Sequence, residues 1–97
     1  MRKIIWLDSA VDDVARLRKF ISKKNPDAAK KAAHAIKTAA ARLVANPLIG
    51  KPIDNLLHYR DFLVRFGAGG YVFRYRVIAQ VTFIVHVRHY REDDFTS

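Results

Sequence analysis

The spacing of hydrophobic and polar positions divides the chain into a strand, two helices and three further strands. Residues 3–7 form a short apolar run that is typical of a strand. Over residues 10–21, apolar side chains recur every three or four positions, as in an amphipathic helix. Their stripe consists of Ala10, Val14, Leu17 and Ile21. Ser9 directly precedes it as the predicted N-cap, with Asp12 three residues later in a capping-box pattern.

Two Asn-Pro pairs delimit the second predicted helix. Asn25-Pro26 ends the first helix and begins the second, with asparagine as the cap and proline at the first helical position. Asn46-Pro47 ends the second helix. Its buried stripe is expected to be Ala29, Ala33, Ile36, Ala40 and Leu43. Because alanine allows close approach, the two helices should form a tight antiparallel hairpin.

The C-terminal half has the alternation of an antiparallel meander. Strand-like segments cover about residues 59–66, 71–78 and 81–89, and short turns connect them. The glycine-rich segment at 67–70 leads into a strand and not a helix, so we interpret its glycines as turn residues and not as a phosphate loop. The predicted fold is α+β: one domain over residues 1–97, with a helical hairpin packed on one face of an antiparallel sheet in the order β-α-α-β-β-β.

Alternation along these strands predicts one apolar face and one basic face. The apolar set, which the hairpin should cover, is Phe62, Val64, Phe66, Tyr71, Phe73, Tyr75, Val77, Val81, Phe83, Val85 and Val87. The other set is Leu63, Arg65, Val72, Arg74, Arg76, Ile78, Thr82, Ile84, His86, Arg88 and Tyr90.

The second set contains a group that we call the basic sheet face, namely Arg65, Arg74, Arg76, His86 and Arg88. Its arginines come from three neighbouring strands, and the set contains no acidic residue. An unneutralised cluster of this kind favours a phosphate or carboxylate site. The alternative interpretation is an ordinary polar surface facing solvent.

Composition adds a strong positive charge to this picture. The 97 residues are 51% hydrophobic, and 18 Lys and Arg against 9 Asp and Glu give a formal charge of +9. Such an excess favours an anionic partner, either nucleic acid or an acidic protein segment. A basic protein without such a partner is the alternative. The sequence predicts no membrane span, signal peptide or disulfide, so we expect a cytoplasmic location.

Few sequence features indicate a catalytic centre. The odd offset between His86 and His89 places them on opposite faces of a strand, so a shared metal ion is not expected. No Walker loop, nucleophile elbow or dinucleotide motif is present, and we predict neither metal nor cofactor. One chemistry stays open: RNA cleavage through the 2′-hydroxyl needs a base, an acid and cations, which His86, Arg88 and Tyr90 could supply.

Several segments resemble the ParE branch of the RelE/ParE toxin family, and the likeness covers nearly the whole chain. They are I-W-L-D-S-A at 5–10, N-P-D-A-A at 25–29, A-N-P-L-I-G-K-P at 45–52, R-Y-R-V-I at 74–78 and V-R-H-Y-R-E-D at 87–93. Their order and spacing match the family together. The resemblance implies a helical hairpin packed on an antiparallel sheet, in agreement with the pattern.

The resemblance also implies the toxin half of a type II toxin–antitoxin pair, of the plasmid stabilisation class. ParE-like toxins inhibit DNA gyrase by trapping it on cleaved DNA, and an acidic ParD-like antitoxin neutralises them. Contact with DNA would then be indirect, through the antitoxin complex. Lys30 and Lys37 are expected to bind the antitoxin's acidic tail, whose apolar residues would enter the alanine-rich groove of the hairpin.

RelE-like relatives instead cut mRNA on the ribosome with basic residues and a C-terminal Tyr or His. In that interpretation the expected catalytic residues are Arg76, Arg88, His89 and Tyr90. In the ParE interpretation the chain is not an enzyme, and its expected target contacts are Arg88, His89 and Arg91. Only Lys51 lies in the loop where the ribonuclease branch is richer in lysine, which favours ParE. A basic interaction module without toxicity is a third interpretation.

Overall fold

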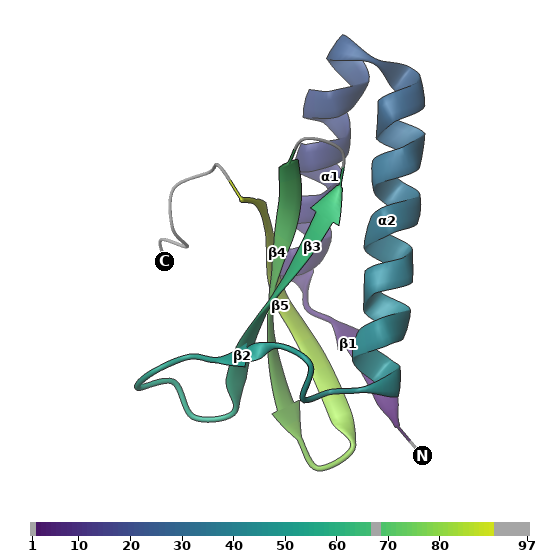
Figure 1. Cartoon of the computed structure of the whole chain (residues 1–97). Helices are drawn as coiled ribbons and strands as arrows, with labels where there is room; N and C mark the ends of the chain where they lie inside the picture. Colours follow the sequence, from purple (N-terminus) through teal and green to yellow (C-terminus); the bar gives the residue numbers. More distant parts are fainter. Residues whose placement is uncertain (1, 67–68, 91–97) are drawn as a thin grey trace.

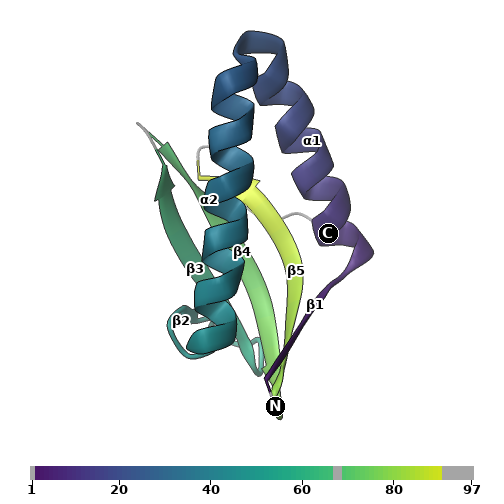
Figure 2. The ribbon, with the colours of Figure 1, turned by 90° about the vertical axis from the view of Figure 1, so that its right-hand side faces the viewer.

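Within residues 2–66 and 69–90, which the computed structural model describes, two helices pack against one face of a five-stranded sheet (Figure 1). The elements in chain order are β1 (Lys3–Trp6), α1 (Asp8–Lys24), α2 (Pro26–Ala45), β2 (Lys51–Pro52), β3 (Tyr59–Phe66), β4 (Gly69–Ile78) and β5 (Val81–His89). Both helices lie on the same side of the sheet (Figure 2). The predicted α+β fold is confirmed.

The strands are ordered β1-β5-β4-β3-β2, and the neighbouring pairs are antiparallel except for β1 and β5. The sheet is therefore mixed, whereas the meander pattern predicts an antiparallel one. Strand β1 pairs in parallel with the first half of β5, from Lys3↔Val81 to Trp6↔Ile84, and so covers backbone groups that would otherwise form an open edge. The two-residue strand β2 covers the start of β3 at the opposite edge.

The two helices begin in different ways. Asn25 caps α2 as predicted, since its Oδ1 accepts hydrogen bonds from the backbone N–H groups of Asp27 at 3.0 Å and Ala28 at 3.3 Å. The prediction for Ser9 is wrong. Helix α1 begins at Asp8, and the hydroxyl of Ser9 donates to the carbonyl oxygen of Val85 at 2.6 Å. Ser9 therefore closes part of the β5 edge beyond the end of β1 instead of capping its own helix.

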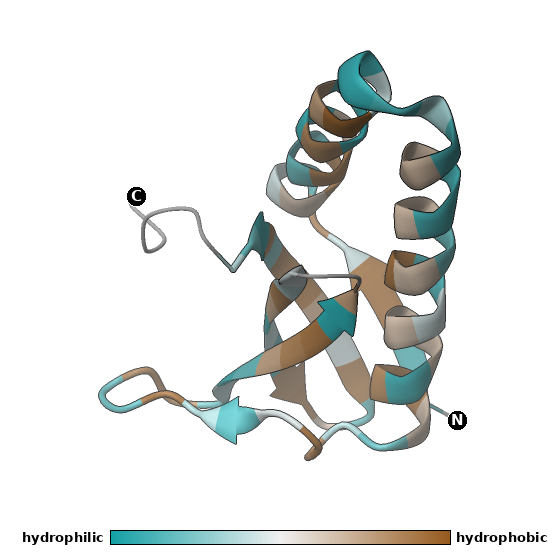
Figure 3. Ribbon diagram, turned by 45° about the horizontal axis from the view of Figure 1, so that its top comes forward, coloured by the Kyte–Doolittle hydropathy of each residue, from teal (hydrophilic) through white to brown (hydrophobic). Residues whose placement is uncertain are grey.

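The core lies between the hairpin and the sheet. It consists of Ala10, Leu17, Ala32, Ile36, Ala39, Leu43, Phe62, Tyr71, Phe73, Tyr75, Ile84 and Val87. Figure 3 shows the same division in α2, whose hydrophobic side faces the sheet and whose hydrophilic side faces outward. Ala33 and Ala40, predicted to be buried, are only half-buried, and the residue before each is buried instead. Paired alanines make the exact stripe ambiguous, because either member fits the 3.6-residue period.

A β-bulge in β5 changes which side chains face the helices. Phe73 pairs with Val87, and two residues further along β4 Tyr75 pairs with Ile84, so β5 has one extra residue at this point. The alternation therefore changes phase near Val85. Thr82 and Ile84, predicted on the uncovered face, are 2% and 0% exposed beneath the hairpin. Their neighbours Val81 and Phe83, predicted beneath the hairpin, take the uncovered face instead.

Candidate functional site

The basic sheet face lies on the side of the sheet away from the hairpin. Strand pairing places Arg74 opposite both Asp61 and His86, while Arg88 is opposite Val72 and Arg65 is opposite Gly70. The predicted grouping of these cations on one face is therefore present. Their environments differ, however, and they do not form one equivalent set of free charges.

The carboxylate of Asp61, which the predicted alternation does not include, neutralises Arg74. The Nε of Arg74 donates to Oδ1 of Asp61 at 3.0 Å, and its Nη2 donates to Oδ2 at 3.1 Å. This bidentate geometry gives a strong, charge-assisted pair. Asp61 belongs to the same face as Leu63 and Arg65, so the statement that this face has no acidic residue is wrong. The predicted strand includes residue 61, but the predicted alternation of its two faces begins only at residues 62 and 63.

His86 is held by helix α1. Its Nδ1 lies 3.0 Å from Oδ2 of Asp13, and the same oxygen accepts the backbone N–H of Val87 at 2.9 Å. Arg16 approaches the other carboxylate oxygen, with Nη2 at 3.7 Å. Asp13 therefore connects the hairpin to the end of β5. The sequence gives no sign of this contact, because 73 residues separate the two side chains.

Arg76 combines an aromatic contact with an available donor. Its guanidinium carbon lies 5.5 Å from the ring centre of Tyr59, which is the geometry of a cation–π contact. Its Nε is buried and has no hydrogen-bond partner among the described residues. A buried donor of this kind costs free energy unless an acceptor satisfies it.

The end of β5 distributes its polar residues over both faces. Arg88 faces away from the hairpin, and its Nη1 donates to the carbonyl oxygens of His89 and Tyr90, both at 3.4 Å. His89 pairs with Tyr71 on the helix-covered face, where the two ring centres are 5.8 Å apart. The phenol of Tyr71 has its pKa raised by burial. Arg91 lies outside the described residues.

The proposed ribonuclease residues are thus only partly brought together. Arg88 adjoins Tyr90, and the ring centres of His89 and Tyr90 are 5.1 Å apart, although His89 projects from the face of β5 opposite to Arg88. Arg76 shares the face of Arg88, yet the Arg74–His86 pair lies between them along β4 and β5.

The outer side of the hairpin contains a groove with a basic rim. One cavity of about 930 Å³ is lined by Ala15, Arg18, Lys19, Ser22, Lys23, Pro26, Ala29, Lys30 and Ala33. A second, of about 340 Å³, is lined by Trp6, Val11, Val14, Ala15, Arg18, Ala33, Ile36 and Lys37. The two cavities share Ala15, Arg18 and Ala33 and therefore adjoin each other. Together they are here called the hairpin groove. Lys30 and Lys37, the predicted antitoxin contacts, both line it.

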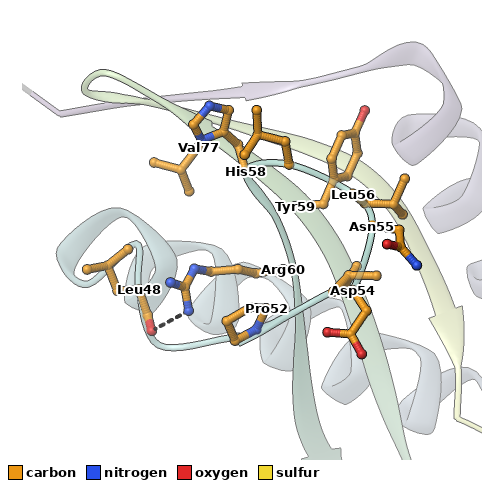
Figure 4. Close-up of a pocket in the computed structure, with 11 residues that line it drawn as sticks. Leu48, Pro52, Asp54, Asn55, Leu56, His58, Tyr59, Arg60 and Val77 are labelled. Atoms are coloured by element: carbon orange, nitrogen blue, oxygen red, sulfur yellow. Dashed lines mark hydrogen bonds between the residues drawn. The ribbon is translucent and has the colours of Figure 1, made fainter.

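A separate cavity of about 670 Å³, here called the loop cavity, lies between the segment after α2 and the ends of β3 and β4 (Figure 4). Tyr75 fixes the beginning of that segment: its hydroxyl accepts the N–H of Gly50 at 2.8 Å and donates to the carbonyl of Pro47 at 2.7 Å. Burial raises the pKa of Tyr75, which keeps the phenol protonated for this role. A side chain at Gly50 would place its Cβ 2.6 Å from that hydroxyl.

Two features are absent from the described residues. No group of three or more His, Cys, Asp or Glu side chains is positioned there to hold a metal ion. None of the helices in residues 2–66 and 69–90 is long and apolar enough to cross a membrane.

Known proteins are similar to this chain in sequence or in fold. Two relatives from Caulobacter vibrioides are similar to the chain: Toxin RelE3 is 32% identical over 77 residues, covering 79% of this chain and 82% of the relative. Toxin RelE2 is 33% identical over 89 residues, covering 92% and 96%. The solved structure "Chromosomal ParDE TA system from P. aeruginosa" shares the fold, with a TM-score of 0.76, 21% identity and coverage of 92% of this chain and 96% of that chain. The model of the family described as "ParE toxin of type II toxin-antitoxin system, parDE" matches residues 4–94, and the chain therefore belongs to this toxin family.

Proposed function

We propose that this toxin arrests bacterial growth by inhibiting DNA gyrase in the cytoplasm and that it acts without enzymatic turnover. The observation that supports this choice most directly is the position of His89. Its ring centre lies 5.1 Å from that of Tyr90, but the side chain projects from the face of β5 opposite to Arg88, whereas metal-independent RNA cleavage needs a base, an acid and cations around one phosphate. A recognition surface has no such requirement, since its contacts can be spread over both sides of a strand end.

The partner proposed for the hairpin groove is an acidic ParD-like antitoxin. The groove is elongated, its floor includes Ala15, Ala29 and Ala33, and Lys30 and Lys37 lie along its length. An extended or helical tail could place apolar side chains against the alanines and carboxylates against the lysines. Complementary charge would accelerate association, and the apolar contacts would slow dissociation.

Cleavage of mRNA on the ribosome is the second candidate function. The relatives named RelE3 and RelE2 favour it, as does the presence of Arg76 and Arg88 on one face of the sheet. In this alternative, Arg76 and Arg88 would stabilise the negative charge of the transition state, and Tyr90 or His89 would transfer a proton.

Two assays with purified protein distinguish these functions. The first measures supercoiling by gyrase and the double-strand breaks that accumulate with it; the second measures cleavage of mRNA bound to ribosomes. The proposal predicts inhibited supercoiling, increased breaks and intact mRNA. Codon-specific cleavage of mRNA without any effect on gyrase would instead establish the ribonuclease.

A further inference from the structure

The loop cavity is surrounded by leucines that the fold leaves in solvent. Leu48, Leu56 and Leu57 are 65%, 42% and 78% exposed, and all three line the cavity together with Ile53 and Val77. None of the residues that line it also lines the hairpin groove. Clustered exposed leucines around a concave site are typical of a protein-binding surface, since a soluble domain gains nothing by exposing them.

The segment that forms this surface is held in one conformation. The Tyr75 hydroxyl fixes its beginning, and the N–H of Val77 donates to the carbonyl of His58 at 3.1 Å at its end. Between them, the N–H of Ile53 donates to the carbonyl of Tyr59 at 3.2 Å. Asn55 and His58 have positive φ angles of 66° and 68°, a backbone conformation that residues other than glycine adopt only at a cost in free energy. The surface is thus formed before any partner binds, which lowers the entropic cost of binding.

The charge at the cavity indicates the chemistry of its occupant. Arg60 lines it, and its Nη1 donates to two neutral carbonyl oxygens, those of Gly50 at 2.7 Å and Leu48 at 3.3 Å. Asp54 also lines the cavity, but the ion pairs within the described residues join Arg16 and His86 to Asp13 and Arg74 to Asp61, not Asp54 to Arg60. The guanidinium therefore keeps a charge that a partner's carboxylate can pair with. A second copy of the chain is a poor occupant, because each copy has a formal charge of +9.

We propose that the loop cavity docks the folded protein that the toxin attacks, through an apolar side chain of that target placed next to a carboxylate. The apolar side chain enters among the leucines, and the carboxylate pairs with Arg60. This inference depends on the proposed function, because it assumes a protein target. A compact, preformed cavity suits one anchor from a rigid surface, whereas the long hairpin groove suits a flexible tail.

The first experiment tests the pocket without reference to any target. The full chain, labelled with nitrogen-15, is titrated with N-acetyl-leucyl-aspartyl amide and, separately, with N-acetyl-leucyl-asparaginyl amide, whose C-termini are both blocked so that only the aspartate side chain has a carboxylate. Saturable shifts of the backbone amides of Leu56, Leu57 and Arg60 are expected with the aspartate probe. The asparagine probe, which lacks the carboxylate, should bind several-fold more weakly. Absence of saturable shifts, or equal binding of the two probes, overturns the proposed chemistry.

The second experiment identifies the partner. Leu57→Asn and Leu48→Asn should keep the melting temperature of the wild type and reduce growth arrest on induction at least about tenfold, as expected for contacts at the centre of an interface. Phe20→Asn is the matched control: it removes a side chain that is 61% exposed on α1 and lines neither site, so its toxicity should remain that of the wild type.

Other outcomes overturn the assignment in distinguishable ways. Unchanged toxicity of both leucine variants excludes the target as occupant. If toxicity is unchanged but co-expression of a cognate antitoxin no longer rescues growth, the antitoxin occupies the cavity. A concentration-dependent dimer that Leu57→Asn abolishes assigns the cavity to a second copy. If the wild-type chain itself fails to arrest growth, the proposed function fails and the target assignment fails with it, whatever the titration shows of the pocket.

Discussion

Substitution of Tyr75 by Phe removes one oxygen atom and tests whether the phenol holds the segment after α2. That oxygen bonds to the N–H of Gly50 and to the carbonyl of Pro47, while the aromatic ring is completely buried. Phenylalanine preserves the ring, so the core should be retained. The change leaves the Gly50 N–H, a buried donor, without its acceptor.

The expected loss follows from the two hydrogen bonds. A buried backbone group left without a partner costs about 1–3 kcal/mol, so we expect Tyr75→Phe to lower the free energy of unfolding by about 2 kcal/mol. For a domain of this size, 1 kcal/mol shifts the melting temperature by roughly 4–8 °C. The predicted decrease is therefore about 8–16 °C. Thermal unfolding followed by circular dichroism measures it, and hydrogen exchange should show faster exchange of the Gly50 amide.

Tyr71→Phe is the matched control. Tyr71 is 2% exposed in the same strand, on the same face as Tyr75, but no hydrogen bond of its hydroxyl is present in the described part of the chain. Its removal should change the free energy of unfolding by less than about 0.5 kcal/mol. Equal melting temperatures for Tyr75→Phe and wild type, or equal losses in the two variants, would refute this account of the phenol.

The remaining predictions concern pH, charge and the β5 edge. Burial raises the pKa of Tyr75 above its ordinary value of 10.0, so its contribution to stability is complete below pH 10 and is lost as the pH rises through the folded-state pKa. Alkaline melts of wild type and Tyr75→Phe should therefore converge. The double variant Lys30→Glu/Lys37→Glu should slow association with an acidic antitoxin, and the difference from wild type should shrink at high salt in surface plasmon resonance. Asp13→Ala removes the acceptor of the Val87 N–H and should cost about 1–3 kcal/mol in denaturant unfolding, whereas Asp12→Ala, at an exposed position, should cost less than about 0.5 kcal/mol.

The fold was predictable where the signals are local. The Asn25-Pro26 pair ends one helix and begins the next through its own cap and ring geometry, and the second pair, Asn46-Pro47, ends α2 in the same local way. The strand segments at 59–66 and 81–89 coincide with β3 and β5 because their alternation is local to each segment, although a bulge shifts it by one residue in β5. None of these features depends on what the segment packs against.

The candidate site was less predictable because its contacts join distant segments. Ser9 has every local feature of an N-cap, yet the open edge of β5 offers its hydroxyl a carbonyl acceptor. The segment that forms the loop cavity has no hydrophobic period, so Leu56 and Leu57 gave no signal in either a helical or a strand pattern. Their role becomes visible only when the hydrogen bonds of Tyr75 and Arg60 fix the path of the backbone.

The bulge explains how one strand can both complete the core and present cations. Ile84 and Val87 are both 0% exposed beneath the hairpin, although an odd spacing would put them on opposite faces of a regular strand. If β5 continued from the buried Ile84 as a regular strand without a bulge, His86 and Arg88 would also lie beneath the hairpin, where burying a charge is costly. The extra residue removes this conflict and places His86 opposite Arg74 on the uncovered side. The bulge therefore lets β5 bury both Ile84 and Val87 beneath the hairpin while His86 and Arg88 stay on the basic sheet face. A regular strand with Val87 buried would instead have placed Ile84 on the uncovered side.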